Sequence, residues 1–321
     1  MLSSRLVMKS SSIALLVLGI ALTANAQNNL ADAATSMRLS RIQSAGQQST
    51  QDIPTLKKHA EQGDAKAELI LAEDYYSGAN SVPQDLTQAA ALFQKAAEQG
   101  NAEAQFYFGI MNFNGQDMPR NSAQAEAWYR KAADQGNVEA QYSLASMYDA
   151  GQGIPQDFVQ AAVWYRKAAD QGLAFAQYNL GLLYDLGEGV PQDSAQAAAW
   201  YRKAADQDFA EAESNLGLLY AHGEGVSQDS AQAANWFRKA AKKGNAQAQY
   251  NLGNAYSKGE GVQQDTAEAY FWIDLASQGH IEGIKDEDIR KARDAAASHL
   301  TTTQLTETQA RVRKWLAAHP G

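Results

Sequence analysis

The chain has 321 residues, of which 20% are charged, 45% hydrophobic and 9% aromatic, and this composition is typical of a folded, water-soluble protein. The formal net charge of −9 at pH 7 argues against general nucleic-acid binding, which requires an excess of basic residues. The chain contains no cysteine, which excludes disulfides, thiol catalysis, zinc–thiolate sites and iron–sulfur clusters.

Residues 1–26 have the three parts of a secretory signal peptide. A positively charged segment precedes the apolar residues 13–22, and Ala24 and Ala26 are the small residues that mark a cleavage site. The apolar part has 10 residues, whereas a helix that spans a bilayer needs about 20. We therefore expect cleavage after Ala26 and export of a bacterial protein to the periplasm or the medium.

Two short segments precede the main body of the chain. Residues 27–51 are rich in Gln, Ser, Asn and Thr with weak periodicity, so we expect a mobile polar leader. Residues 52–63 are similar to the second half of the repeats described next, because Leu56 and Gly63 occupy matching positions. This segment is predicted to form an N-terminal capping helix.

A period of 36 residues governs residues 64–279, and tryptophan, glycine and aspartate all recur at that spacing. The tryptophans are Trp128, Trp164, Trp200, Trp236 and Trp272. Self-similarity at a fixed period of this length indicates an array of stacked supersecondary units. We expect six repeats in this region, followed by a C-terminal helical cap in residues 280–321, where the period disappears.

Each repeat is predicted to contain two helices. In residues 137–172, apolar residues recur at helical spacing, two glycines and a proline interrupt the pattern, and Asp157 starts a second helix as its N-cap. Trp164 lies in the buried stripe of that helix, and Gly172 ends it in a left-handed conformation. Glycine in the middle of a first helix costs about 1 kcal/mol relative to alanine, so we expect a neighbouring side chain to pack on the bare backbone there. These glycines are Gly109, Gly181, Gly217 and Gly253.

The repeat resembles the Sel1-like repeat, a relative of the tetratricopeptide repeat. The matching residues are Ala140, Gln141, Tyr142, Leu144, Tyr148, Gly151, Gly153, Asp157, Ala161 and the run from Trp164 to Gly172. The resemblance implies an all-α fold, namely a right-handed α/α solenoid, or superhelix, of six ~36-residue helix-turn-helix repeats with helical caps. It also implies a non-enzymatic adaptor in the bacterial envelope, monomeric in the free state, which binds a peptide or protein partner on its concave face.

Two alternatives remain open for the function. Some helicobacterial relatives bind β-lactams, which favours a protein that binds or hydrolyses cell-wall or β-lactam compounds, although those relatives are cysteine-rich. The other alternative is a structural assembly factor of an envelope machine that uses the convex face.

The residues predict no catalytic site, no metal site and no cofactor. The five histidines do not recur with the period and lack zinc-binding spacing. The Gly-Glu-Gly segments at 187–189 and 223–225 follow a helix rather than a strand, so they do not fit a dinucleotide loop. The Arg-Lys pair that recurs near the end of the second helix is interpreted as favourable charge at a helix C-terminus, with a phosphate-binding face as the alternative.

A column of asparagines on the first helices is the candidate peptide-binding site. Its members are Asn179, Asn215 and Asn251, with Ser143 at the same position one repeat earlier. An amide both donates and accepts hydrogen bonds, so it suits the backbone of an extended peptide, and asparagine columns hold peptides in similar tetratricopeptide grooves. The alternative is that each asparagine bonds a carbonyl of a neighbouring loop. Leu182 and Leu218, in the adjoining column, are predicted apolar anchors.

Overall fold

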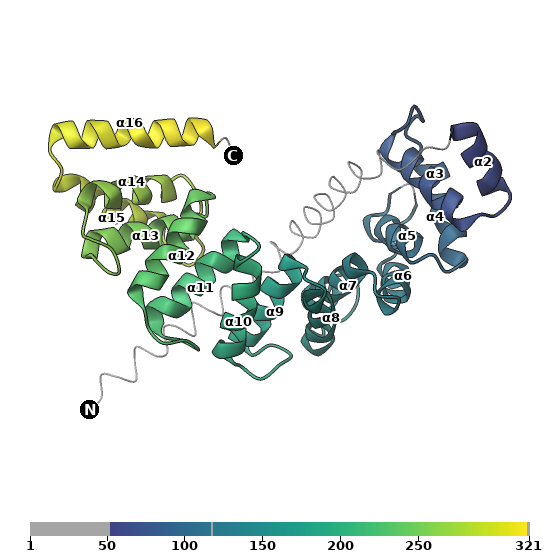
Figure 1. The fold of residues 1–321 in the computed structure, drawn as a ribbon, viewed down its shortest axis with the longest axis horizontal. Helices are drawn as coiled ribbons and strands as arrows, with labels where there is room; N and C mark the ends of the chain where they lie inside the picture. The colour runs from purple at the N-terminus through teal and green to yellow at the C-terminus, as the bar shows by residue number, and fades with distance from the viewer. Residues whose placement is uncertain (1–51, 117, 320–321) are drawn as a thin grey trace. The chain divides into compact units, whose positions relative to one another are not determined.

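The computed structural model describes residues 52–116 and 118–319, so the predicted signal peptide and leader lie outside the described residues. All regular elements in the described part of the chain are α-helices (Figure 1). They are α2 (Ile53–Glu61), α3 (Ala65–Ser77), α4 (Leu86–Glu98), α5 (Ala102–Asn114), α6 (Ser122–Asp134), α7 (Val138–Ala150), α8 (Phe158–Asp170), α9 (Ala174–Leu186), α10 (Ser194–Ala205), α11 (Ala210–His222), α12 (Ser230–Lys242), α13 (Ala246–Lys258), α14 (Thr266–Ala276), α15 (Asp286–Ser298) and α16 (Thr302–Ala318). None of these helices is long and apolar enough to cross a membrane.

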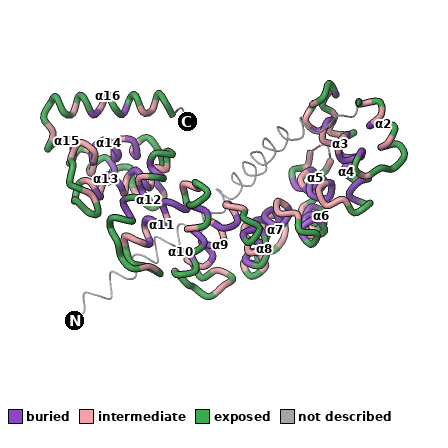
Figure 2. Tube along the Cα trace, in the orientation of Figure 1, coloured by how far each residue is buried: buried purple, intermediate pink, exposed green. Residues whose placement is uncertain are grey.

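The described helices fall into two compact units, one within residues 52–176 and the other within residues 177–319. In the first unit α3 packs on α4, α5 on α6 and α7 on α8, and in the second α11 packs on α12 and α13 on α14. Buried residues follow the faces that the paired helices share (Figure 2). This arrangement confirms the predicted all-α fold of helix-turn-helix repeats. We number the repeats 1 to 6 from the pair α3–α4 to the pair α13–α14.

Polar caps and glycines set the ends of these helices, as the sequence predicts. The Asp157 carboxylate accepts the backbone N–H of Gln160 at 3.0 Å and starts α8, since a free N–H of the first turn needs an acceptor. Asp193 and Asp229 begin α10 and α12 in the same way. Gly151 ends α7 with a φ of +63°, which is a left-handed conformation.

The glycines within the first helices have the packing role that we expect. A Cβ on Gly217 would lie 2.6 Å from the ring of Phe237, and one on Gly181 would lie 2.7 Å from the ring of Tyr201. The aromatic ring of the second helix therefore rests on bare backbone of the first. This contact brings the two helices of a repeat close together.

Four of the five recurring tryptophans lie in the core, as predicted, and Trp128 is half-buried. Trp200 is 5% exposed, and the ammonium of Lys203 lies 3.7 Å from its ring centroid. Arg202 donates to the Tyr220 hydroxyl of the next repeat at 2.5 Å and lies over the Trp236 ring at 4.9 Å. The Arg-Lys pair thus stabilises packing within and between repeats, a role that its position at a helix end did not predict.

Buried glutamines also connect successive repeats. Gln141 donates to the Ala133 carbonyl of the preceding repeat at 3.0 Å and accepts from the Gln171 amide at 2.8 Å. Gln171 in turn donates to the Gly136 carbonyl at 3.1 Å. We call this pattern the glutamine ladder, and its side-chain pair recurs in repeats 2 and 4.

Repeat 5 replaces the glutamine pair of the ladder by an ion pair. The Lys243 ammonium donates to the buried Glu213 carboxylate at 2.8 Å, and it also contacts the carbonyl and the carboxylate of Asp208 at 2.8 and 2.9 Å. Asp208 stands where other repeats have a glycine and keeps the left-handed conformation, with a φ of +65°. The two departures from the repeat pattern therefore form one contact.

The terminal helices cover apolar surface at each end of the array. Leu56 of α2 packs against Leu71 of α3. At the other end, Ile289 of α15 packs against Ile273 of α14, and α16 lies along α14 with Val312 buried against it (Figure 1).

Candidate interaction site

The asparagine column lies on the first helices of three successive repeats. Asn179 belongs to α9, Asn215 to α11 and Asn251 to α13, and each is half-buried. Half-burial leaves part of each residue accessible at an equivalent position of the array, but the side-chain nitrogen of Asn251 is itself buried. The other two predicted contact positions in this unit, on α9 and α11, differ from each other. Leu182 is buried at 6% exposure, whereas Leu218 is half-buried.

Ser143, the equivalent residue in repeat 3, is buried on α7 at 5% exposure. The structure therefore leaves little of this side chain available to a ligand. The eight consecutive residues 140–147 of α7 are all buried, which reflects a first helix that packs on several sides at once.

The Asn215 amide makes intramolecular hydrogen bonds. It bonds the hydroxyls of Tyr178 on α9 and Tyr201 on α10, and the Tyr201 hydroxyl donates to the Asp185 carboxylate at 3.3 Å. We call these four residues the Asp185 cluster. Asn215 thus links repeat 5 to repeat 4, and its partners are tyrosine hydroxyls rather than the loop carbonyl of the alternative hypothesis.

Burial governs the electrostatics of the Asp185 cluster. Desolvation raises the pKa of Asp185 to about 6, an effect that the Tyr201 hydrogen bond opposes and the nearby Glu224 reinforces. Desolvation also raises the pKa of Tyr178 and Tyr201, while the Asn215 bond lowers both. At neutral pH the cluster therefore presents an ionised, partly buried carboxylate beside neutral tyrosines, an arrangement that accepts hydrogen bonds.

Asn251 has a different environment from Asn215. Its side-chain oxygen accepts from Gln247 at 3.2 Å, and its side-chain nitrogen has no hydrogen-bond partner among the described residues. An unsatisfied buried donor is costly. The binding role of the column stays a prediction. Asn215 makes two hydrogen bonds within the fold, whereas Asn251 makes one and leaves its side-chain nitrogen unpaired among the described residues.

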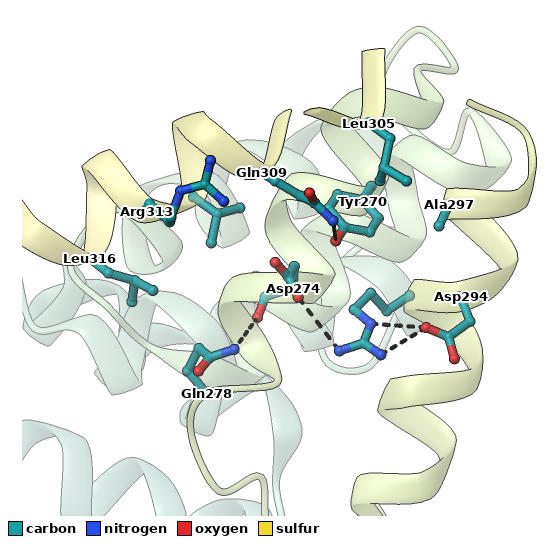
Figure 3. Close-up of a pocket in the computed structure, with 11 residues that line it drawn as sticks. Tyr270, Asp274, Gln278, Asp294, Ala297, Leu305, Gln309, Arg313 and Leu316 are labelled. Carbon is teal, nitrogen blue, oxygen red and sulfur yellow. Dashed lines mark hydrogen bonds and ion pairs between the residues drawn. The ribbon is translucent and has the colours of Figure 1, made fainter. Parts of the chain in front are cut away.

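A groove of about 560 Å³ lies between α14, α15 and α16 (Figure 3). In it Arg293 pairs with Asp294 at 2.8 Å and approaches the Asp274 carboxylate at 3.7 Å. Desolvation raises the pKa of Asp274, and Arg293 opposes that rise. Arg313 also lines the groove, so its two arginines and two aspartates carry no net formal charge. Sequence reasoning missed the groove because two of its three helices, α15 and α16, lie outside the period.

Catalytic or metal chemistry has no support in these arrangements. Within the described ranges, no group of three or more His, Asp or Glu side chains is placed to hold a metal ion. The Asp185–Tyr201 pair lacks the adjoining nucleophile and base that a catalytic site requires.

Comparison with known families decides the affiliation of the repeats. The Sel1 repeat model matches six consecutive segments, residues 65–101, 102–137, 138–173, 174–209, 210–245 and 246–280. The chain belongs to the Sel1 repeat family. Sel1 repeat proteins are generally protein-interaction scaffolds rather than enzymes.

Two solved Sel1 structures show the same fold. A protective antigen of uropathogenic Escherichia coli strains is 38% identical with a TM-score of 0.72, and the match covers 82% of this chain and 55% of the antigen. A Sel1 repeat protein from Oxalobacter formigenes is 31% identical with a TM-score of 0.58, over 70% of this chain and 88% of that one. The chain thus spans little more than half of the antigen. No curated protein matches the chain.

Proposed function

We propose that this Sel1 repeat protein is an exported, non-enzymatic adaptor that binds a protein segment on the first-helix face that carries Asn179, Asn215 and Asn251. The carrying observation is that the three asparagine residues are half-buried at equivalent positions of successive repeats. Repetition at a fixed spacing suits an extended segment, whose backbone offers donors and acceptors along its length. The proposal identifies this face with the concave surface of the solenoid.

The half-buried residues define where a partner would make most contact. Leu218 offers apolar surface one helical turn from Asn215, and residues at this spacing share a helix face. Ser143 and Leu182 are buried and would contribute little. The proposed contact surface therefore centres on α11 and α13.

Site-specific photo-crosslinking in the bacterial envelope tests the face. A photoreactive residue at position 218 should give crosslinked protein adducts, whereas one at position 199, exposed on second helix α10, should not. Mass spectrometry of the adducts identifies the partner. Adducts at position 199 alone would refute the first-helix proposal and favour the assembly-factor alternative.

Export is proposed from the signal peptide in residues 1–26, which lie outside the described residues. The intact mass of the protein recovered from the periplasm or the medium should correspond to residues 27–321. A mass that retains the first 26 residues would contradict cleavage.

A further inference from the structure

The outer face of α8 carries the two exposed large hydrophobic side chains of the described part of the chain. Val159 is 57% exposed and Val163 is 45% exposed. They are four positions apart and therefore adjacent on one helix face. At the equivalent positions, α6 and α10 have alanine pairs and α12 has alanine and asparagine. Among repeats 2 to 5, large apolar residues at these positions are thus confined to repeat 3.

The chain itself shows what covers a large apolar residue at this position. Phe271 of α14 corresponds to Val163 in the repeat register, and it is 6% exposed. Helix α16 covers it, because Val312 lies in the same apolar cluster and the Arg311 guanidinium lies over the Phe271 ring at 4.6 Å. The small residues at this position in α6, α10 and α12 are exposed. An amphipathic helix therefore accompanies the bulky side chain.

Charge complementarity indicates what kind of helix would fit on α8. Arg166 and Lys167 follow the valines on this helix, and the Lys167 ammonium lies over the Trp164 ring at 3.7 Å. On α14 the matching positions are Asp274 and Leu275. A helix bearing acidic side chains beside its apolar stripe is thus favoured on α8.

The same argument disfavours α16 of a second copy as the occupant. That helix has three basic residues in its second half, Arg311, Arg313 and Lys314. On α14, Arg313 lines the same groove as Asp274, which corresponds to Arg166. If α16 lay on α8 in the same way, Arg313 would therefore come near Arg166 with like charge, which destabilises a contact.

We propose that the outer face of α8 docks an acidic amphipathic helix of a partner protein, with its apolar stripe on Val159 and Val163 and its carboxylates beside Arg166 and Lys167. The docking follows the way in which α16 lies along α14. This surface lies on a second helix and is separate from the asparagine column, so the proposal does not depend on the proposed function.

A designed peptide serves as the probe. It has the sequence of residues 302–318 with Arg311→Glu, Arg313→Glu and Lys314→Glu, and a second peptide keeps the native basic residues. Fluorescence anisotropy measures the affinity of each labelled peptide for the full chain. We expect the acidic peptide to bind at least tenfold more tightly than the basic one.

Protein variants then locate the binding. Val159→Ser with Val163→Ser should weaken the acidic peptide at least tenfold, while the matched control Ala195→Ser with Ala199→Ser on α10 should leave its affinity unchanged. Both substituted pairs are exposed, so circular dichroism should show native helix content. Lys167→Glu should weaken the acidic peptide and strengthen the basic one.

Three results would overturn the proposal. The first is equal affinity for the native chain and the valine variant, and the second is equal affinity for the two peptides. The third is a dimer in sedimentation velocity that the valine substitutions dissociate, since the occupant would then be a second copy.

Discussion

Replacing Lys243 by glutamine tests how the fold stabilises the Glu213 carboxylate, whose side chain is fully buried at 0% exposure. The glutamine would restore the residue type of other repeats and keep two hydrogen bonds within reach. Gln99 already donates to the buried Glu68 at 2.6 Å in repeat 1, and Gln171 donates to a backbone carbonyl of the preceding repeat. The substitution therefore removes the positive charge more than it removes hydrogen bonds.

The expected cost of Lys243→Gln is about 2–4 kcal/mol in the free energy of unfolding. Removing one partner of a buried ion pair costs about 3–5 kcal/mol, and a retained neutral hydrogen bond recovers about 1 kcal/mol. The double variant Glu213→Gln with Lys243→Gln recreates the pair of repeats 2, 3 and 4. It should lie within about 1 kcal/mol of the native chain, because replacing both charges removes the uncompensated one.

Denaturant unfolding, followed by tryptophan fluorescence and circular dichroism, measures the free energy of unfolding of the native chain, of each single variant and of the double variant. Desolvation raises the pKa of Glu213, and Lys243 opposes the rise. The loss of Lys243 should raise that pKa further, so the deficit of Lys243→Gln should be largest at neutral pH and shrink as the carboxyl becomes protonated at lower pH. A single variant as stable as the native chain, or a double variant as unstable as the single, would refute this account.

Three further changes probe other contacts. Asp185→Asn should raise the free energy of unfolding by about 1–3 kcal/mol at pH 7.5. The pKa of Asp185 is raised to about 6, so its carboxyl stabilises the fold at low pH and loses this contribution as the pH rises through 6. Thermal melts from pH 4 to 8 check this, and a variant with the same pH dependence as the native chain would contradict it. Trp200→Ala should lower the free energy of unfolding by about 3–5 kcal/mol, because a buried aromatic side chain is lost. An unchanged midpoint of denaturant unfolding would contradict the assignment of Trp200 to the core. Gly217→Ala should destabilise the fold by about 1–2 kcal/mol despite the better helix propensity of alanine, because the new Cβ would collide with Phe237. Adding Phe237→Leu should restore part of the lost stability. A higher melting temperature for Gly217→Ala alone would argue against the collision.

The repeat fold was predictable because local rules support each periodic column. An aspartate before an apolar stripe indicates an N-cap, and a glycine after it indicates a left-handed end, so Asp157 and Gly172 could be placed without a structure. The glutamine ladder was not predicted, because its bonds join residues 30 positions apart and a glutamine at a helix end is equally compatible with exposure. In repeat 5 the two glutamines are replaced together by Glu213 and Lys243, and this paired change in the sequence indicates that the two positions are in contact.

The candidate site was predictable only in part. The period correctly indicated that Asn215 lies on a first helix, but not that its amide bonds Tyr178 and Tyr201, because those contacts depend on how neighbouring repeats stack. The burial of Ser143 has the same origin, since an apolar stripe on one helix does not show how many neighbours surround it. Phe271 is a large residue at a position where every other repeat except repeat 3 has alanine or asparagine, and this difference was a sequence sign of the cover that α16 provides.

The contact between Lys243 and Asp208 favours one order of repeats 4 and 5. Gln171 bonds a backbone carbonyl of the preceding repeat, and any residue supplies that acceptor. Lys243 bonds the corresponding carbonyl of Asp208 too, but it also bonds the Asp208 carboxylate, a side chain that only repeat 4 provides at this position. An array in which another repeat preceded repeat 5 would leave Lys243 without its second carboxylate. Repeats 4 and 5 are therefore less freely exchanged for other repeats than repeats joined only through backbone carbonyls.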